Sequence, residues 1–219
     1  MRRLFPDALD DIDPVVAYTD VRRRRHDGRP WLLVNMITSL DGAVALDQRS
    51  GGLGGPADQR VFHLLRDLAD VVLVGAGTAR AERYGPPAKP GQRIAVVTRS
   101  ANLDWSSPLF ASGAGLVVTA EDAPAVPVDN VRAGQGAVDL AAALDRLEGD
   151  VVLCEGGPEL NGELITIGAA DEWCLTLSPM LVGGGAGRAA RATTARPTGF
   201  DLVHVLEEAG FLFLRAVRA

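Results

Sequence analysis

Residues 151–160 carry the most chemically suggestive pattern, because an apolar run ends at Glu155-Gly156-Gly157-Pro158 just before a predicted helix. Glycine has no Cβ atom, so a ligand can approach its backbone closely, and the first N–H groups of a helix point at an anion. The segment could therefore bind a phosphate beside a carboxylate. Taken alone, it fits an ordinary strand-to-helix turn equally well.

A second glycine junction, Gly75-Ala76-Gly77-Thr78, follows the apolar run 71–74. Ligands of open α/β sheets bind at the carboxyl ends of strands, so the two junctions could form the floor of one nucleotide site. The junction lacks the third glycine and the downstream acidic residue of the Rossmann fingerprint, and the chain contains no P-loop Gly-Lys-Ser/Thr. The pattern therefore lies outside both of these nucleotide-binding motifs.

Other polar side chains also stand where a ligand could meet them. The loop after the first predicted strand carries Thr38, Ser39 and Asp41, although Asp41-Gly42 is also a common turn. Arg66 and Arg99 could bind phosphate through paired N–H groups, while a solvated surface position is the commoner alternative for a lone arginine.

Metal and hydrolase chemistry find no support in the sequence. The three histidines, His26, His63 and His204, lack ligand spacing and are predicted to lie at the surface of helices or strands. Cys154 and Cys174 each lie within an apolar run, which predicts buried thiols rather than a disulfide or a zinc site. A Ser-His-Asp hydrolase is disfavoured because no Gly-x-Ser-x-Gly is present.

The 219 residues, 47% of them hydrophobic, suffice for one sizeable α/β domain, and the net charge of −6 argues against a general nucleic-acid binder. The arginine run 22–25 is interpreted as a solvated helix face, with an interaction patch as the second choice. No apolar stretch reaches the ~18 residues that span a bilayer, and the start lacks an apolar signal core. We therefore expect a cytoplasmic protein without membrane contact.

Apolar runs alternate with amphipathic segments, as in an α/β sheet protein. Strands are predicted at 31–37, 71–74, 93–98, 115–119, 151–154 and 172–177. Helices are predicted at 57–69, through 83 after the second junction, at 138–147 and at 158–167. Residues 172–177 and 201–217 are expected to form a closing antiparallel section, with a turn at 208–210 between its last two strands. The aperiodic stretch 183–197 is expected to be a mobile surface loop.

Four segments in order, 34–42 (Val-Asn-Met-Ile-Thr-Ser-Leu-Asp-Gly), 65–67 (Leu-Arg-Asp), 72–78 (Val-Leu-Val-Gly-Ala-Gly-Thr) and 155–158 (Glu-Gly-Gly-Pro), resemble the reductase domain of riboflavin biosynthesis. Within that family the chain is most similar to the stand-alone pyrimidine reductases. The resemblance implies a dihydrofolate reductase-like fold with three layers: a mixed, mostly parallel sheet, helices on both faces and an antiparallel C-terminal hairpin. Residues 1–30 would be an N-terminal extension and 31–219 a single reductase domain.

The resemblance further implies NADPH-dependent reduction of an aminopyrimidine ribose phosphate, as in a 5-amino-6-(5-phosphoribosylamino)uracil reductase. It also implies a homodimer, for which the apolar C-terminal strands give the only support in the sequence. Hydride would pass from the nicotinamide to the C1′ imine and open the sugar to a ribitylamine. Two alternatives remain: a reductase of a pteridine or dihydrofolate-like heterocycle, and a nucleotide-binding relative without catalysis.

The family pattern assigns residues to the two halves of the pocket. Ser39, Asp41, Arg66 and Glu155 would face the substrate, with Glu155 or Asp41 supplying a proton or stabilising an iminium. The residues implied for the cofactor are Thr38, Leu53, Gly54, Gly75, Gly77, Thr78, Glu82, Ser100, Gly156, Gly157, Pro158, Glu159, Leu160 and Asn161. Arg99 is added on charge grounds for the 2′-phosphate, and a cis peptide is expected at Gly156-Gly157.

The chain departs from the family pattern at three places near the expected pocket. Asn35 stands where members commonly have lysine, and Glu82-Arg83 where they have Asp-Pro. The loop that usually contains Trp-Ile near the nicotinamide reads Gly52-Leu53-Gly54-Gly55. These changes bear on the substrate more than on the cofactor.

Overall fold

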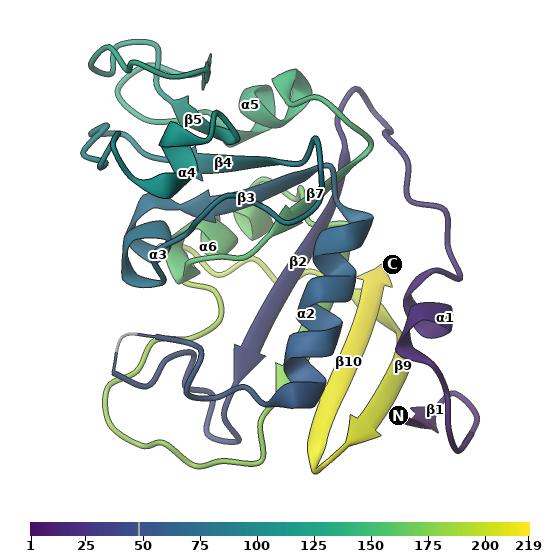
Figure 1. Cartoon of the computed structure of the whole chain (residues 1–219). Coiled ribbons are helices and arrows are strands. Elements are labelled where there is room, and N and C mark those ends of the chain that lie inside the picture. The colour runs from purple at the N-terminus through teal and green to yellow at the C-terminus, as the bar shows by residue number, and fades with distance from the viewer. Residues whose placement is uncertain (48) are drawn as a thin grey trace.

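The computed structural model describes residues 1–47 and 49–219 (Figure 1). Their strands form one sheet in the order β1-β9-β10-β8-β2-β7-β3-β4-β5-β6. The bounds are β1 Arg2–Phe5, β2 Trp31–Thr38, β3 Val71–Gly75, β4 Arg93–Val97, β5 Gly115–Thr119, β6 Asn130–Arg132, β7 Val151–Cys154, β8 Glu172–Leu177, β9 Phe200–Glu208 and β10 Phe211–Arg218.

The run from β8 through β2, β7, β3, β4 and β5 to β6 is parallel throughout. The other three strands pair antiparallel, with β10 between β8 and β9 and β1 at the edge. The predicted closing hairpin is confirmed, and its turn at Ala209-Gly210 has φ values of 53° and 83°. The central parallel strands β3 and β7 are apolar on both faces, as expected for strands covered on each side.

The helices cover both faces of the sheet, which confirms the predicted three layers. Their bounds are α1 Pro14–Tyr18, α2 Pro56–Leu68, α3 Ala76–Ala81, α4 Pro108–Ala111, α5 Leu140–Arg146 and α6 Pro158–Thr166. Helices α5 and α6 share a core with one face of β2, β7 and β3. Helices α1 and α2 cover the opposite face of β2 and β7, and α3 and α4 cover that face of β3 to β5.

The arginine run 22–25 is not a solvated helix face, and that prediction is wrong. Arg23 is buried and donates from Nε and Nη2 to Glu172 on β8, at 2.7 Å each. Arg215 on β10 donates to the same carboxylate from Nε at 2.7 Å. Arg25 instead donates to the backbone carbonyls of Asp145 and Leu147. Arg23 and Arg25 therefore hold the N-terminal segment against the rest of the protein.

The prediction that all three histidines lie at the surface also fails, at His204. Its side chain on β9 is buried and its ring meets the Tyr18 ring edge-on, with 4.7 Å between the centroids. Burial, aided by the Arg215 charge, lowers the pKa of His204 to about 4, so the imidazole is neutral near pH 7. Both cysteines are buried and free, as predicted.

Four short elements were not predicted: β1, α1, α4 and β6. Each has three to five residues, too few to establish a periodicity. The predicted helix through residue 83 ends at Ala81, and Arg83 has a positive φ of 55°. Among the described residues, no helix has the length and apolar character needed to cross a bilayer.

Candidate active site

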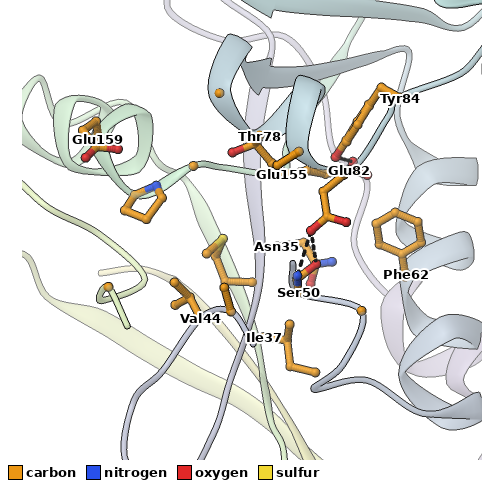
Figure 2. A pocket seen from close by; sticks show the side chains of 18 of the residues that line it. Asn35, Ile37, Val44, Ser50, Phe62, Thr78, Glu82, Tyr84, Glu155 and Glu159 are labelled. Carbon is orange, nitrogen blue, oxygen red and sulfur yellow. Dashed lines mark hydrogen bonds between the residues drawn. The ribbon is translucent and has the colours of Figure 1, made fainter. Parts of the chain in front are cut away.

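A pocket of about 600 Å³ opens at the carboxyl ends of β2, β3 and β7 (Figure 2). Strand β2, helices α2 and α3, the start of α6 and loop residues at 44–45, 50–51, 187 and 191 contribute to its wall. Its lining residues are Asn35, Met36, Ile37, Val44, Ala45, Ser50, Gly51, Asp58, Gln59, Phe62, Gly77, Thr78, Ala81, Glu82, Tyr84, Glu155, Gly157, Pro158, Glu159, Gly187 and Arg191.

The two predicted glycine junctions meet at this pocket. The Gly75 N–H donates to the Gly156 carbonyl at 2.7 Å. A Cβ atom on Gly157 would lie 2.7 Å from the Thr78 Oγ1, so a side chain there would fill the space beside the α3 hydroxyl. The Gly156-Gly157 peptide is cis, as predicted. Gly157 is also the N-cap of α6, so the first free N–H groups of that helix start at the pocket.

Glu155 is fixed between two partners that were not expected to contact it. Arg66 on α2 donates from Nε and Nη2 to the two carboxylate oxygens of Glu155, at 2.7 Å each. Tyr84 donates its hydroxyl to Oε2. The Arg66 guanidinium also lies over the Phe62 ring, 4.4 Å from its centroid. The Glu155 side chain is 4% exposed, so this carboxylate is a positioned, nearly buried group.

Tyr84 acts on Glu155 as a hydrogen-bond donor. Burial raises the pKa of its phenol well above the ordinary value, and the adjacent Glu155 charge raises it further. The hydroxyl therefore stays protonated across the neutral range. Arg66 and Tyr84 together therefore orient the Glu155 carboxylate.

Ser39 and Asp41 do not line the pocket. Ser39 donates its hydroxyl to Asp41, and the Asp41 carboxylate accepts the N–H groups of Val182 at 3.1 Å and Gly183 at 2.6 Å. These hydrogen bonds, that from Ser39 first, lower the pKa of Asp41 to about 2. Asp41 is thus ionised near neutral pH and ties two loops together, which disfavours it as the proton donor.

The residues predicted for the cofactor divide into two groups. Those that line the pocket are Gly77, Thr78, Glu82, Gly157, Pro158 and Glu159. Those that do not are Thr38, Leu53, Gly54, Gly75, Gly156, Leu160 and Asn161. Glu82 accepts the Ser50 N–H at 2.7 Å and its hydroxyl at 3.0 Å, and Figure 2 shows the two side chains meeting.

Two residues of the second group have structural partners instead. Leu53 is fully buried, and its carbonyl accepts the Ser178 hydroxyl at 2.8 Å. Asn161 is buried and donates to the Ala189 carbonyl at 2.7 Å, so it holds the loop that passes the pocket. The sequence motif alone does not distinguish such supporting residues from contact residues.

Arg99 and Ser100 lie together in a second hollow of about 500 Å³ at the ends of β4 and β5. Ala120, Asp122, Ala123 and Pro124 complete its wall. The hollow follows the same carboxyl edge of the sheet as the main pocket, because β4 and β5 run parallel to β3. It could therefore hold the far end of an elongated ligand.

Several pocket residues were missed from the sequence. Asp58 and Phe62 precede Arg66 on α2 at intervals of four, so all three share one helix face, and this spacing could have identified them. Tyr84 left no such signal, because it follows the turn at Arg83 outside any element. Among the described residues no cluster of metal-ligating side chains is found.

Comparisons with known proteins identify the family of the chain. The family model described as RibD C-terminal domain matches residues 30–207. A 2,5-diamino-6-ribosylamino-4(3H)-pyrimidinone 5′-phosphate reductase of Methanothermobacter thermautotrophicus is 30% identical over 174 residues, which is 71% of this chain and 81% of that protein.

Solved structures support the fold. A pyrimidine reductase-like protein of Corynebacterium diphtheriae superposes with a TM-score of 0.76 at 23% identity, covering 94% of this chain and 95% of the other. A dihydrofolate reductase of Enterococcus faecalis superposes with a TM-score of 0.54 at 14% identity, covering 86% and 96%. The resemblance and the reductase class predicted from the four ordered motifs are thus confirmed, and the chain belongs to the RibD C-terminal domain family.

Proposed function

We propose that this chain is an NADPH-dependent reductase of an aminopyrimidine ribose phosphate in riboflavin biosynthesis. The observation that carries the proposal is the meeting of both glycine junctions beside a pocket lined by Glu155, whose carboxylate pairs with Arg66 outside the lining. One end of the pocket suits phosphate, and the other offers fixed polar groups and an aromatic ring. A reductase needs one region for the cofactor and an adjoining region for the substrate, because the nicotinamide and the acceptor carbon must lie next to each other.

The residues present fit NADPH. A Cβ atom on Gly157 would fill the space beside Thr78, so this glycine keeps open the approach to the start of α6. Gly157, Thr78 and the first N–H groups of α6 would hold the diphosphate. Arg99 would bind the 2′-phosphate in the second hollow. When bound, NADPH would supply the hydride that reduces the imine carbon C1′, while the imine nitrogen takes up a proton.

Glu155 would act on the substrate as a fixed anion. Arg66 and Tyr84 hold its carboxylate in one orientation, so it can stabilise positive charge at the iminium without reorganising. The Arg66 Nη1 is not used in the contacts with Glu155 and is the group we assign to the substrate phosphate. Arg66 thus positions Glu155 and binds substrate with separate edges of one guanidinium.

Turnover with matched candidate substrates tests this function. We expect steady NADPH oxidation with an aminopyrimidine ribose phosphate and none above background with dihydrofolate. Arg99→Ala should weaken NADPH binding about tenfold and leave NADH binding within about twofold, because only NADPH carries the 2′-phosphate. Oxidation with dihydrofolate alone would refute the substrate, and equal losses for both cofactors would refute the role of Arg99.

The proposal includes a cytoplasmic homodimer. The buried free thiols of Cys154 and Cys174 are typical of a reducing compartment. Leu40 and Leu181 are 56% and 75% exposed, and the Leu40 N–H donates to the Met180 carbonyl, so these residues form one apolar surface. Light scattering should give a dimer mass for the wild type and a monomer mass for Leu181→Asp; a monomeric wild type would contradict the dimer.

A further inference from the structure

Four carboxylates line the pocket, and Asp58 differs from the other three. Glu155 pairs with Arg66, Glu159 pairs with Arg191 at 3.3 Å, and Glu82 accepts hydrogen bonds from Ser50. Within residues 1–47 and 49–219, no ion pair or hydrogen bond is found for the Asp58 carboxylate, and the Thr176 hydroxyl on β8 is the polar group that lowers its pKa. Much of its capacity to accept hydrogen bonds is therefore unused.

The local backbone leaves room for this carboxylate. A Cβ atom on Gly54 would lie 2.8 Å from Oδ2 of Asp58, so the glycine loop before α2 permits the side chain to lie there. Burial raises the pKa of Asp58, and Thr176 offsets only part of this effect. A ligand that filled the pocket would desolvate the carboxylate further, so it must bring N–H donors to avoid a large penalty.

The chemistry around Asp58 indicates which part of a ligand meets it. A phosphate is disfavoured at Asp58, because the one cation among the lining residues, Arg191, already pairs with Glu159. Arg66, to which we assign the substrate phosphate, lies eight residues further along α2. Phe62, one turn further along α2, and Asn35 on β2 offer an aromatic edge and an amide to a planar heterocycle. The group opposite Asp58 is therefore the polar edge of the substrate ring.

We propose that Asp58 is a specificity-determining residue that binds the amino group and the adjacent ring N–H of a 2-aminopyrimidinone. This inference rests on the proposed reductase function. A carboxylate accepts two parallel N–H donors, and the 2-amino group beside N3–H presents that pattern. A uracil ring instead has a carbonyl at position 2, which would place a lone pair against the carboxylate. Asp58 thus selects the 2,5-diaminopyrimidinone ribose phosphate over its uracil counterpart.

Asp58→Asn tests this role, because an amide keeps the size of the side chain but can donate to a carbonyl. Asp67→Asn is the matched control, since Asp67 is an exposed carboxylate on the same helix and does not line the pocket. For each protein, kcat/KM is measured with both ribose phosphates, together with NADPH affinity and the melting temperature. The ratio of the two kcat/KM values is the decisive quantity.

We expect the wild type to favour the 2-amino substrate at least about tenfold, and Asp58→Asn to lower this ratio at least about tenfold. Asp67→Asn should keep the wild-type ratio, and NADPH affinity should stay within about twofold in both variants. A wild-type preference for uracil, or an Asp58→Asn ratio equal to wild type, overturns the inference.

Two further outcomes separate the alternatives. In the first turn of α2, Asp58 also interacts favourably with the helix dipole. A lower melting temperature with an unchanged ratio would make that its role and overturn the inference, as would a loss of NADPH affinity alone. Turnover of neither ribose phosphate by the wild type would overturn the proposed function and this inference with it.

Discussion

At Gly157 the backbone lies so close to Thr78 that one added methyl group would fill the space between them. The added Cβ atom of Gly157→Ala would lie 2.7 Å from the Thr78 Oγ1. We expect NADPH affinity to fall about tenfold or more, because the side chain and the diphosphate would compete for one space. Nicotinamide fluorescence measures this affinity.

Gly85→Ala is the control for that substitution, because a Cβ atom at Gly85 would have no atom within 4 Å and its φ is not positive. It should bind NADPH as the wild type does. Equal NADPH affinity in the wild type, Gly157→Ala and Gly85→Ala would show that Gly157 does not contact the cofactor.

Glu155 should matter to turnover and little to cofactor binding. Glu155→Gln removes the anion that Arg66 and Tyr84 orient, so we expect kcat to fall about 100-fold and NADPH affinity to stay within about twofold. Glu148→Gln, at an exposed position outside the pocket, should leave both unchanged. Steady-state kinetics with NADPH titration checks this, and a change confined to affinity would contradict it.

The sequence analysis assigned Glu155 and Arg66 to the substrate separately, and in the structure Glu155 lines the pocket while Arg66 contacts it through Glu155. Their mutual bidentate pairing joins residues 89 positions apart, and no local pattern encodes such a contact. Asp41 shows the reverse case, because its Ser-x-Asp-Gly motif was recognised while its backbone partners at 182 and 183 lie on a distant loop.

At the level of elements, the N-terminal segment depends on the buried acid Glu172. Burial alone would raise the pKa of Glu172, but the guanidinium groups of Arg23 and Arg215 outweigh it, and the pKa lies below its ordinary value. Arg23→Ala removes one of these two partners. Because the Glu172 side chain is fully buried, water cannot replace the lost guanidinium. We expect the free energy of unfolding to fall by about 3 kcal/mol.

Urea denaturation measures that loss. Arg22→Ala is the matched control, because Arg22 is exposed and outside the Glu172 cluster, and it should change stability by less than about 0.5 kcal/mol. Equal effects of the two substitutions would show that the N-terminal segment is not held by Arg23.

The loops that Asp41 joins should separate in acid. Its pKa is lowered to about 2 in the folded protein from 3.8, so the stabilisation is complete above pH 3.8 and is lost as the pH falls toward 2. The protection of the Val182 and Gly183 amides against hydrogen exchange should therefore fall over this range. In Asp41→Asn this protection should already be weak above pH 3.8, and strong protection there would show that Asp41 does not hold the two loops together.

Across the whole molecule, the long parallel strands and the helices α2 and α6 were predictable because their apolar patterns run for four residues or more between clear turns. The order of strands was not, since it depends on which faces pack together. The edge strands β1 and β6 were missed because pairing, and not local sequence, creates them. The second hollow likewise arises only when β4 and β5 lie side by side.

The proposed reaction is hydride transfer from NADPH to C1′ of an aminopyrimidine ribose phosphate in the pocket beside Glu155. It is tested most directly with NADPH deuterated at the transferable position, followed by mass spectrometry of the product. We predict a ribitylamine that carries one deuterium at C1′, formed in equal amount to the NADPH consumed. NADPH consumption without deuterium at C1′, or no consumption with this substrate, would contradict the account.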